Sequence, residues 1–91
     1  MTKQDLVNEI AKRTGLEKKL IQETIEATMS VIKDSLIRRE SVYLRGFGSF
    51  NVKHRAKKTA RNITENITIQ IPARDIPSFK PAKSFVEEVD K

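Results

Sequence analysis

The hydrophobic positions at the start of the chain recur at helical spacing. A first group predicts a helix over residues 3–14 and consists of Leu6, Val7, Ile10 and Ala11. Thr2 is a favourable N-cap residue with Asp5 at the spacing of a capping box, and Gly15 is a natural stop. A short helix with one apolar face is therefore expected at the amino terminus.

A second, longer helix is expected over about residues 18–38. Its apolar positions include Leu20, Ile21, Ile25, Ala27, Met29, Val31, Ile32, Leu36 and Ile37. This set is too wide for a helix that buries only one narrow face. The excess apolar surface indicates that something besides the first helix covers it.

From residue 42 the pattern changes to that of strands and turns. Val42 and Leu44 begin a strand, and the glycines on both sides of Phe47 predict a tight turn with a buried ring. Tyr43 and Phe47 are both expected in the core. Phe50 and Val52 then alternate inward along a returning strand.

A long hairpin arm is predicted over about residues 53–72. The isoleucines at 67, 69 and 71 alternate with polar residues, which is the period of a strand. Pro72 and Pro77 interrupt the returning strand, as is typical of an edge or bent strand. A final helix is expected from Lys80 to Asp90, with Pro81 in its first turn and with Phe85 and Val89 facing inward.

Charge is distributed unevenly along the chain. Residues 1–52 carry nine bases and seven acids, whereas residues 53–91 carry nine bases and five acids. Residues 41–64 contain no acid, and five Lys or Arg occupy the nine positions 53–61. A basic hairpin with no obvious core beneath it favours a polyanion as its partner, and nucleic acid is the commonest one.

Several classes of function are disfavoured by what the chain lacks. It has no cysteine, so disulfides and thiolate metal sites are excluded, and His54 is its only histidine. No convergent pair of carboxylates is evident, so we expect no enzyme, no metal and no cofactor. The longest apolar run is three residues, too short for a membrane span, and a cytoplasmic protein is expected.

Without its arm the chain has a body of roughly seventy residues, which would bury only about 60% of its unfolded surface. Together with the wide apolar surface of the second helix, this predicts an intertwined homodimer. A small monomer with some exposed apolar residues is the alternative.

Several motifs in order identify a family resemblance. They are Arg45-Gly46-Phe47-Gly48-Ser49-Phe50, Arg55-Ala56, Arg61-Asn62, Ile71-Pro72-Ala73 and Ile76-Pro77-Ser78-Phe79-Lys80-Pro81-Ala82-Lys83. The chain resembles the HU/integration host factor family of bacterial DNA-bending proteins along its whole length, without an insertion. The resemblance implies an α+β fold: a helical dimer base, a three-stranded antiparallel sheet saddle and one long β-hairpin arm per subunit.

The resemblance also implies a single domain over residues 1–91. A helical dimerisation part covers 1–40, the sheet with its arm covers 41–80, and a C-terminal helix covers 81–91. The implied function is architectural: binding and bending of double-stranded DNA in the bacterial nucleoid through arms in the minor groove. An integration host factor-like, sequence-preferring subunit and an RNA- or polyanion-binding module are the alternatives, and pairing with a paralogue is allowed.

The candidate DNA-binding residues fall into three groups. The arm group consists of Lys53, Arg55, Lys57, Lys58, Arg61, Asn62 and Ile63. The saddle group, which matches basic positions of the family, consists of Lys3, Lys80 and Lys83. Arg45 precedes the Gly-Phe-Gly unit and is expected either to contact phosphate or to probe the shape of the minor groove.

The tip of the arm departs from the family pattern. The family commonly has a proline after Arg61-Asn62, which wedges between base pairs, and this chain has Ile63. Glu65 places an acid near the expected phosphates, and Asn66 replaces a turn glycine. We expect Ile63 to act as the wedge, because isoleucine is one of the side chains used in this way.

Overall fold

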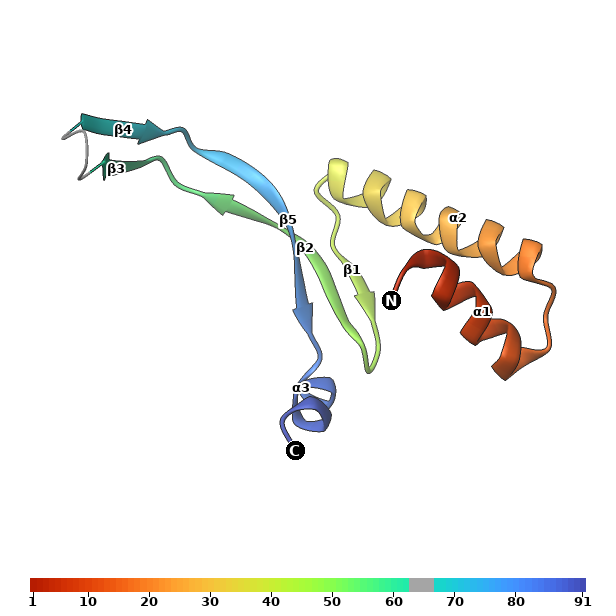
Figure 1. The fold of residues 1–91 in the computed structure, drawn as a ribbon. Coiled ribbons are helices and arrows are strands. Elements are labelled where there is room, and N and C mark those ends of the chain that lie inside the picture. The colour runs from red at the N-terminus through yellow and green to blue at the C-terminus, as the bar shows by residue number, and fades with distance from the viewer. Residues whose placement is uncertain (63–66) are drawn as a thin grey trace. The chain divides into compact units, whose positions relative to one another are not determined.

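The computed structural model describes the backbone of residues 1–62 and 67–91 and the side chains of residues 1–59 and 70–91. Two helices are followed by five strands and a short third helix (Figure 1). The chain divides into two compact units, residues 1–34 and residues 35–91.

The first unit contains helix α1 (Lys3–Thr14) and most of helix α2 (Lys18–Ile37). The expected capping box is present at the start of α1: the Thr2 hydroxyl accepts a hydrogen bond from the Asp5 N–H, and the Asp5 carboxylate accepts one from the Thr2 N–H. Hydrogen bonding to Thr2, chiefly to its backbone N–H, lowers the pKa of the Asp5 carboxyl. Gly15 ends α1 with φ of 73°, so the predicted boundaries are confirmed.

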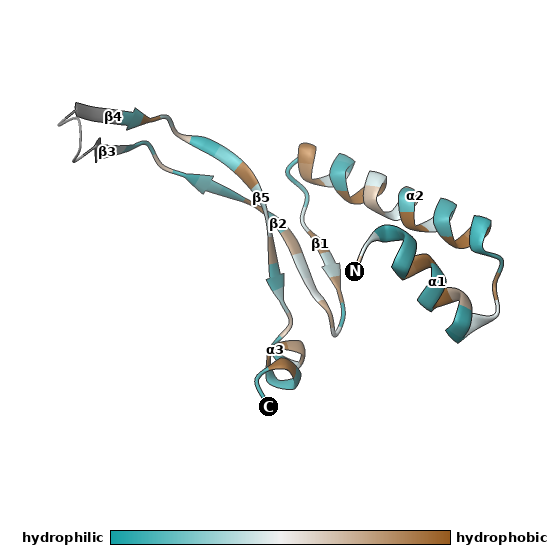
Figure 2. Cartoon of the chain, viewed as in Figure 1, coloured by the Kyte–Doolittle hydropathy of each residue, from teal (hydrophilic) through white to brown (hydrophobic). Residues whose placement is uncertain are grey.

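The long helix α2 keeps much of its apolar surface in contact with solvent. Ile21 is buried, whereas the exposed fractions of Leu20, Met29 and Val31 are 52%, 46% and 66%. Hydrophobic residues recur along the length of α2 in Figure 2. The excess apolar surface predicted from the sequence is therefore real in the isolated chain.

The second unit is built on a three-stranded antiparallel sheet. Its strands are β1 (Val42–Leu44), β2 (Gly48–Arg55) and β5 (Arg74–Pro81), in the order β1-β2-β5. The β1–β2 turn closes with a 2.9 Å hydrogen bond from the Phe47 N–H to the Leu44 carbonyl. This confirms the tight turn predicted around Phe47.

All four phenylalanines of the chain gather in this unit. Phe50 lies opposite Phe79 with ring centroids 5.0 Å apart, and Phe47 contacts both Phe79 (5.1 Å) and Phe85 (5.6 Å). A side chain at Gly48 would collide with the Phe79 ring and the backbone, so only glycine allows this approach. Phe47 as a whole residue is nevertheless 47% exposed, so the prediction of a buried ring is wrong for the single chain.

The arm extends the β2–β5 ribbon through a second ladder, β3 (Lys58–Asn62) with β4 (Ile67–Ile71) (Figure 1). The ladders are separated by residues 56–57 on one strand and 72–73 on the other. The register is the same on both sides, from Gly48 opposite Pro81 to Asn62 opposite Ile67. Pro72 has no N–H to donate, which accounts for a break at this point.

Two details near the carboxyl end differ from the prediction. Pro77 does not interrupt the returning strand but pairs with Val52 inside β5, which is tolerated because β5 is an edge strand. Pro81 ends β5, and helix α3 begins two residues later (Lys83–Val89). Val89 is 73% exposed and does not face inward, whereas Phe85 packs on Phe47 as expected.

Candidate nucleic-acid interface

The register of β2 and β5 gathers polar and basic side chains on one face of the ribbon. Residues directly opposite each other in an antiparallel pair share a face, and faces alternate along each strand. The face opposite the phenylalanines therefore carries four cross-strand pairs: Ser49–Lys80, Asn51–Ser78, Lys53–Ile76 and Arg55–Arg74. Every position of β2 and β5 is described, and this face holds four bases and no acid.

Arg74 is a candidate that the sequence analysis missed. It begins β5 directly opposite Arg55 and is exposed to solvent. Two like charges in a cross-strand pair repel each other, so the pair favours a shared anionic partner. Counting the register back from the Ile76-Pro77 motif across the predicted hairpin could have revealed it.

A hollow of about 320 Å³ lies at the break between the two ladders. Arg55, Arg74 and Lys58 line it together with apolar residues that include Ile71 and Pro72. An uninterrupted strand would place Lys58 on the opposite face from Arg55. Both residues line this hollow, and the exposed Lys57 lies within the break itself.

The other end of the ribbon has a second hollow, of about 460 Å³. Arg45, Lys80 and Lys83 line it, and thus three of the predicted saddle and turn residues meet at one place. Lys83 is the first residue of α3, and Arg45 lies in the β1–β2 turn. The sheet therefore presents bases at both ends of the same ribbon.

Tyr43 also lines this second hollow, and the residue is 77% exposed. It lies opposite Ser49, which is itself opposite Lys80, so the tyrosine belongs to the polar face of the sheet. The prediction that Tyr43 is a core residue is wrong. The alternation of β1 is displaced by one residue from that expectation, since Val42 pairs with Phe50 on the aromatic face.

Lys3 belongs to the first unit and has a partner there. Its ammonium lies 2.7 Å from the Glu26 carboxylate, and both side chains are about half exposed. The hydrogen bond from Lys3 holds the pKa of Glu26 below its usual value. This places Lys3 at the start of α1 in an ion pair that a phosphate would have to share or replace.

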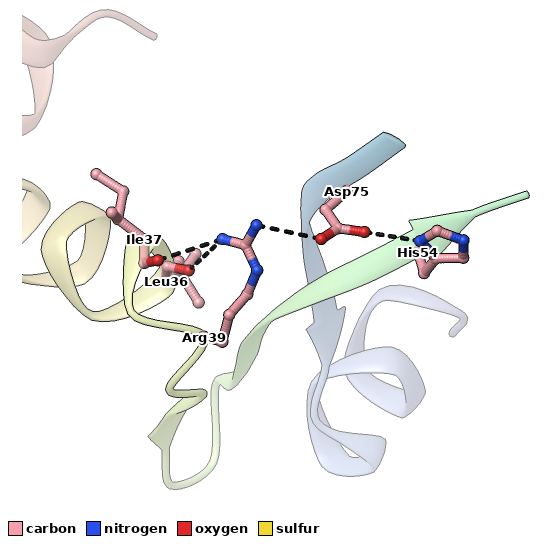
Figure 3. A network of polar contacts seen from close by, with 5 residues as sticks. All are labelled: Leu36, Ile37, Arg39, His54 and Asp75. Carbon is pink, nitrogen blue, oxygen red and sulfur yellow. Dashed lines mark hydrogen bonds and ion pairs between the residues drawn. The ribbon is translucent and has the colours of Figure 1, made fainter. Parts of the chain in front are cut away.

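The aromatic face of the ribbon carries a polar cluster farther out. His54 lies opposite Asp75, with 2.8 Å between the imidazole Nδ1 and the carboxylate, and the Arg39 guanidinium approaches the same carboxylate at 3.1 Å (Figure 3). The hydrogen bond from His54, with the charge of Arg39, lowers the pKa of Asp75. The one acid of β2 and β5 is thus turned away from the basic face and compensated.

Three candidate residues lie at the end of the arm. Arg61 and Asn62 belong to β3, where they pair with Thr68 and Ile67, although their side chains are not among those described. Ile63 lies outside the described residues, as do Glu65 and Asn66.

Within the described part of the chain, no group of three or more His, Asp or Glu side chains could hold a metal ion. None of the described helices is long and apolar enough to cross a membrane.

Comparison with known sequences places the chain among proteins of one family. The family model described as bacterial DNA-binding protein matches residues 1–90. DNA-binding protein HU of Buchnera aphidicola is 44% identical over 85 residues, which cover 93% of this chain and 92% of the relative. Integration host factor subunit beta of Marinobacter nauticus is 38% identical over 91 residues, with 99% and 93% covered.

Known structures agree with this result. The HU–DNA cocrystal structure from Anabaena superposes with a TM-score of 0.89 at 32% identity, covering 98% of this chain and 97% of that one. HU from Thermotoga maritima gives a TM-score of 0.69 at 27% identity, with 98% of both chains covered. The three helices and the antiparallel sheet, the motifs and the relatives agree: the chain belongs to the bacterial DNA-binding protein family that includes HU and integration host factor.

Proposed function

We propose that this protein is an architectural DNA-binding protein that acts as a homodimer in the nucleoid and bends duplex DNA largely without sequence preference. It acts by binding and not by catalysis. The observation that carries the proposal is the basic face of the β2–β5 ribbon, where Lys53, Arg55, Arg74 and Lys80 occur without an acid. An Anabaena relative of similar structure has been crystallised with DNA.

The proposed contacts follow from the shape of the ribbon. A two-stranded ribbon is thin enough to follow a minor groove about 6 Å wide, which a helix cannot enter. Bases along the ribbon then meet phosphates on both sides of the groove and release counterions. These contacts read the backbone and not the bases, so they give affinity with little sequence preference.

The proposed dimer rests on apolar surface that the isolated chain leaves exposed. A largely apolar hollow of about 400 Å³ is lined by Phe79, Pro81, Phe85, Val86 and Val89. Together with the exposed apolar residues of α2, it offers surface that a second copy can cover. A dimer would also present two arms to one duplex.

Bending is assigned to the end of the arm, on the basis of the sequence. Ile63 occupies the position of the family's wedge proline, and an inserted isoleucine can unstack a base step and kink the duplex. Ile63→Ala should reduce the bend more than the affinity, whereas Ile63→Pro should keep most of the bend.

The function is tested with a short duplex labelled at both ends. Energy transfer should rise when the protein binds, and binding should weaken steeply as salt is added. Nicked duplex, intact duplex and duplex RNA are compared at one salt concentration, because A-form RNA has a different groove. Equal affinity for duplex RNA, or binding without a change in transfer, would refute the architectural function.

The alternative of a sequence-preferring subunit is favoured by Arg45, which lines the basic hollow at the sheet. Competition between random duplex and duplexes selected for tight binding separates the two. Affinities within a fewfold of each other support the sequence-tolerant function, whereas discrimination of about 10³ or more is typical of a specific binder.

The homodimer is tested by unfolding at several protein concentrations. The midpoint should rise with concentration, because dimer stability follows mass action. A midpoint independent of concentration, together with a monomeric mass in solution, would refute the dimer.

A further inference from the structure

Asp75 is an acid on a ribbon whose other charges favour a polyanion. A carboxylate here repels phosphate, so we looked for a structural role that would explain its presence. Its two oxygens contact different side chains: Oδ1 lies 2.8 Å from Nδ1 of His54, and Oδ2 accepts a 3.1 Å hydrogen bond from the Arg39 guanidinium (Figure 3). The carboxylate thus joins β2 and β5 to the corner that follows α2.

This cluster lies beyond the point where the sheet narrows from three strands to two. Strand β1 pairs with β2 only as far as Val42 opposite Phe50, whereas the β2–β5 ladder continues to Arg55 opposite Arg74. A two-stranded ribbon is marginally stable in water and needs a third strand or other packing. His54 and Asp75 form the pair next to the last pair of this ladder, on its unsupported part.

Arg39 is well placed to supply that support. Its φ is 65°, an uncommon conformation for a residue other than glycine, and its N–H donates to the Leu36 carbonyl at 2.9 Å. The guanidinium also donates to the carbonyls of Leu36 and Ile37, at 3.5 and 3.2 Å. The planar guanidinium therefore contacts the end of α2 on one side and Asp75 on the other.

We propose that Asp75 is a positioning residue, which with Arg39 and His54 forms a strut that takes the place of a third strand at the root of the arm. The strut fixes the direction in which the arm leaves the sheet. It lies on the aromatic face, so it leaves the basic face free. Its effect on DNA rests on the proposed function, whereas its effect on the free protein does not.

The first test measures amide hydrogen exchange in the free protein. In Asp75→Asn, amides of β2 and β5 beyond Val52 should exchange about two to five times faster, the range expected from the loss of exposed ion pairs. Amides at 48–50 and in α1 should not change. Asp75→Glu keeps the charge and should restore most of the protection.

A matched control distinguishes the effect of losing the strut from the effect of changing the net charge. Glu88→Gln removes one negative charge from the exposed face of α3, outside the cluster, and should leave exchange at the arm root unchanged. Arg39→Gln should also speed exchange at the arm root, and its effect should add less than fully to that of Asp75→Asn in the double variant, because both changes remove the Arg39–Asp75 ion pair. Unchanged exchange in Asp75→Asn, or equal acceleration in Glu88→Gln, would overturn the proposal.

The second test measures the bend of a labelled duplex. The arm root should be more mobile in Asp75→Asn, so this variant should bend DNA less. With the duplex equally saturated by each variant, the mean energy transfer should be lower for Asp75→Asn than for Glu88→Gln. Faster exchange with an unchanged bend would overturn the claim that the strut directs the arm on DNA. Failure of the parent protein to bind duplex DNA would instead refute the proposed function and leave the exchange result standing.

Discussion

The two ends of the β2–β5 ribbon are held by different interactions. Near the β1–β2 turn, Phe50 and Phe79 pack across the ladder, Phe47 and Phe85 extend the cluster, and β1 adds a third strand. Beyond Val52, the described residues of β2 and β5 are held by the ladder and by the Arg39–Asp75–His54 cluster. Aromatic packing therefore determines the shape of the base of the ribbon. The conformation of the outer ribbon depends instead on the polar cluster and on the bound partner.

The largest expected difference between these regions is in stability. Phe79→Ala should lower the free energy of unfolding by about 3 kcal/mol, because it empties the centre of the aromatic cluster. Thr59→Ala, in the outer ladder, should change it by less than about 0.5 kcal/mol. Urea denaturation at one protein concentration measures both, and similar losses at both sites would show that the outer ribbon is part of the core.

For DNA binding, substitutions in the outer ribbon should have the large effects and should change stability little. Arg55→Gln and Arg74→Gln each remove a base from the polar face and should flatten the plot of log K against log salt by about 0.9 for each phosphate that is no longer neutralised. Their unfolding midpoints should stay close to that of the parent. Lys12→Gln, an equal charge change on exposed α1, should leave the slope unchanged; a slope that responds equally to all three would show that only net charge matters.

Tyr43 offers a way to see whether the interface reaches the base of the sheet. It is the only tyrosine, there is no tryptophan, and its ring lines the hollow with Arg45 and Lys80. Its emission should change when duplex DNA binds and return when salt dissociates the complex. An emission that responds to protein concentration but not to DNA would mean that a second copy covers the ring.

The smallest expected effect is the pH dependence of the strut. The pKa of Asp75 is lowered in the folded protein, so the contribution of its carboxylate is complete above the ordinary pKa of an aspartate. It is lost as pH falls through the lower folded value. The ratio of exchange rates between Asp75→Asn and the parent at the arm root should therefore approach one in acid, and a ratio that stays constant would exclude the carboxylate charge as the cause.

The helices and the turn could be predicted because their signals are local. The capping box at Thr2 and Asp5, the stop at Gly15 and the glycines beside Phe47 each specify backbone geometry within a few residues. The motifs around Phe79 then identified the family. The sequence also predicted α2's excess apolar surface, which the isolated chain exposes.

What failed depended on pairing between distant residues. The sequence does not show which face of the sheet an aromatic strand residue occupies, and Tyr43 was wrongly assigned to the core. Its pairing with Ser49 places it on the polar face. Arg74 and Asp75 acquire their roles only from the residues opposite them, Arg55 and His54.

The register continues without a shift across residues 56–57 and 72–73, and this limits which insertions and deletions the arm can accept. Since the pairs continue in step from Gly48–Pro81 to Asn62–Ile67, residues can be added or removed only in matched numbers on the two strands. A change of two on each side would lengthen or shorten the reach by about 7 Å at ~3.3 Å per residue and keep every side chain on its face. A residue added to one strand alone would have to form a bulge or shift the outer register, and one residue added to each strand would move the outer side chains to the opposite faces. Variation in arm length should therefore be found in even, paired steps.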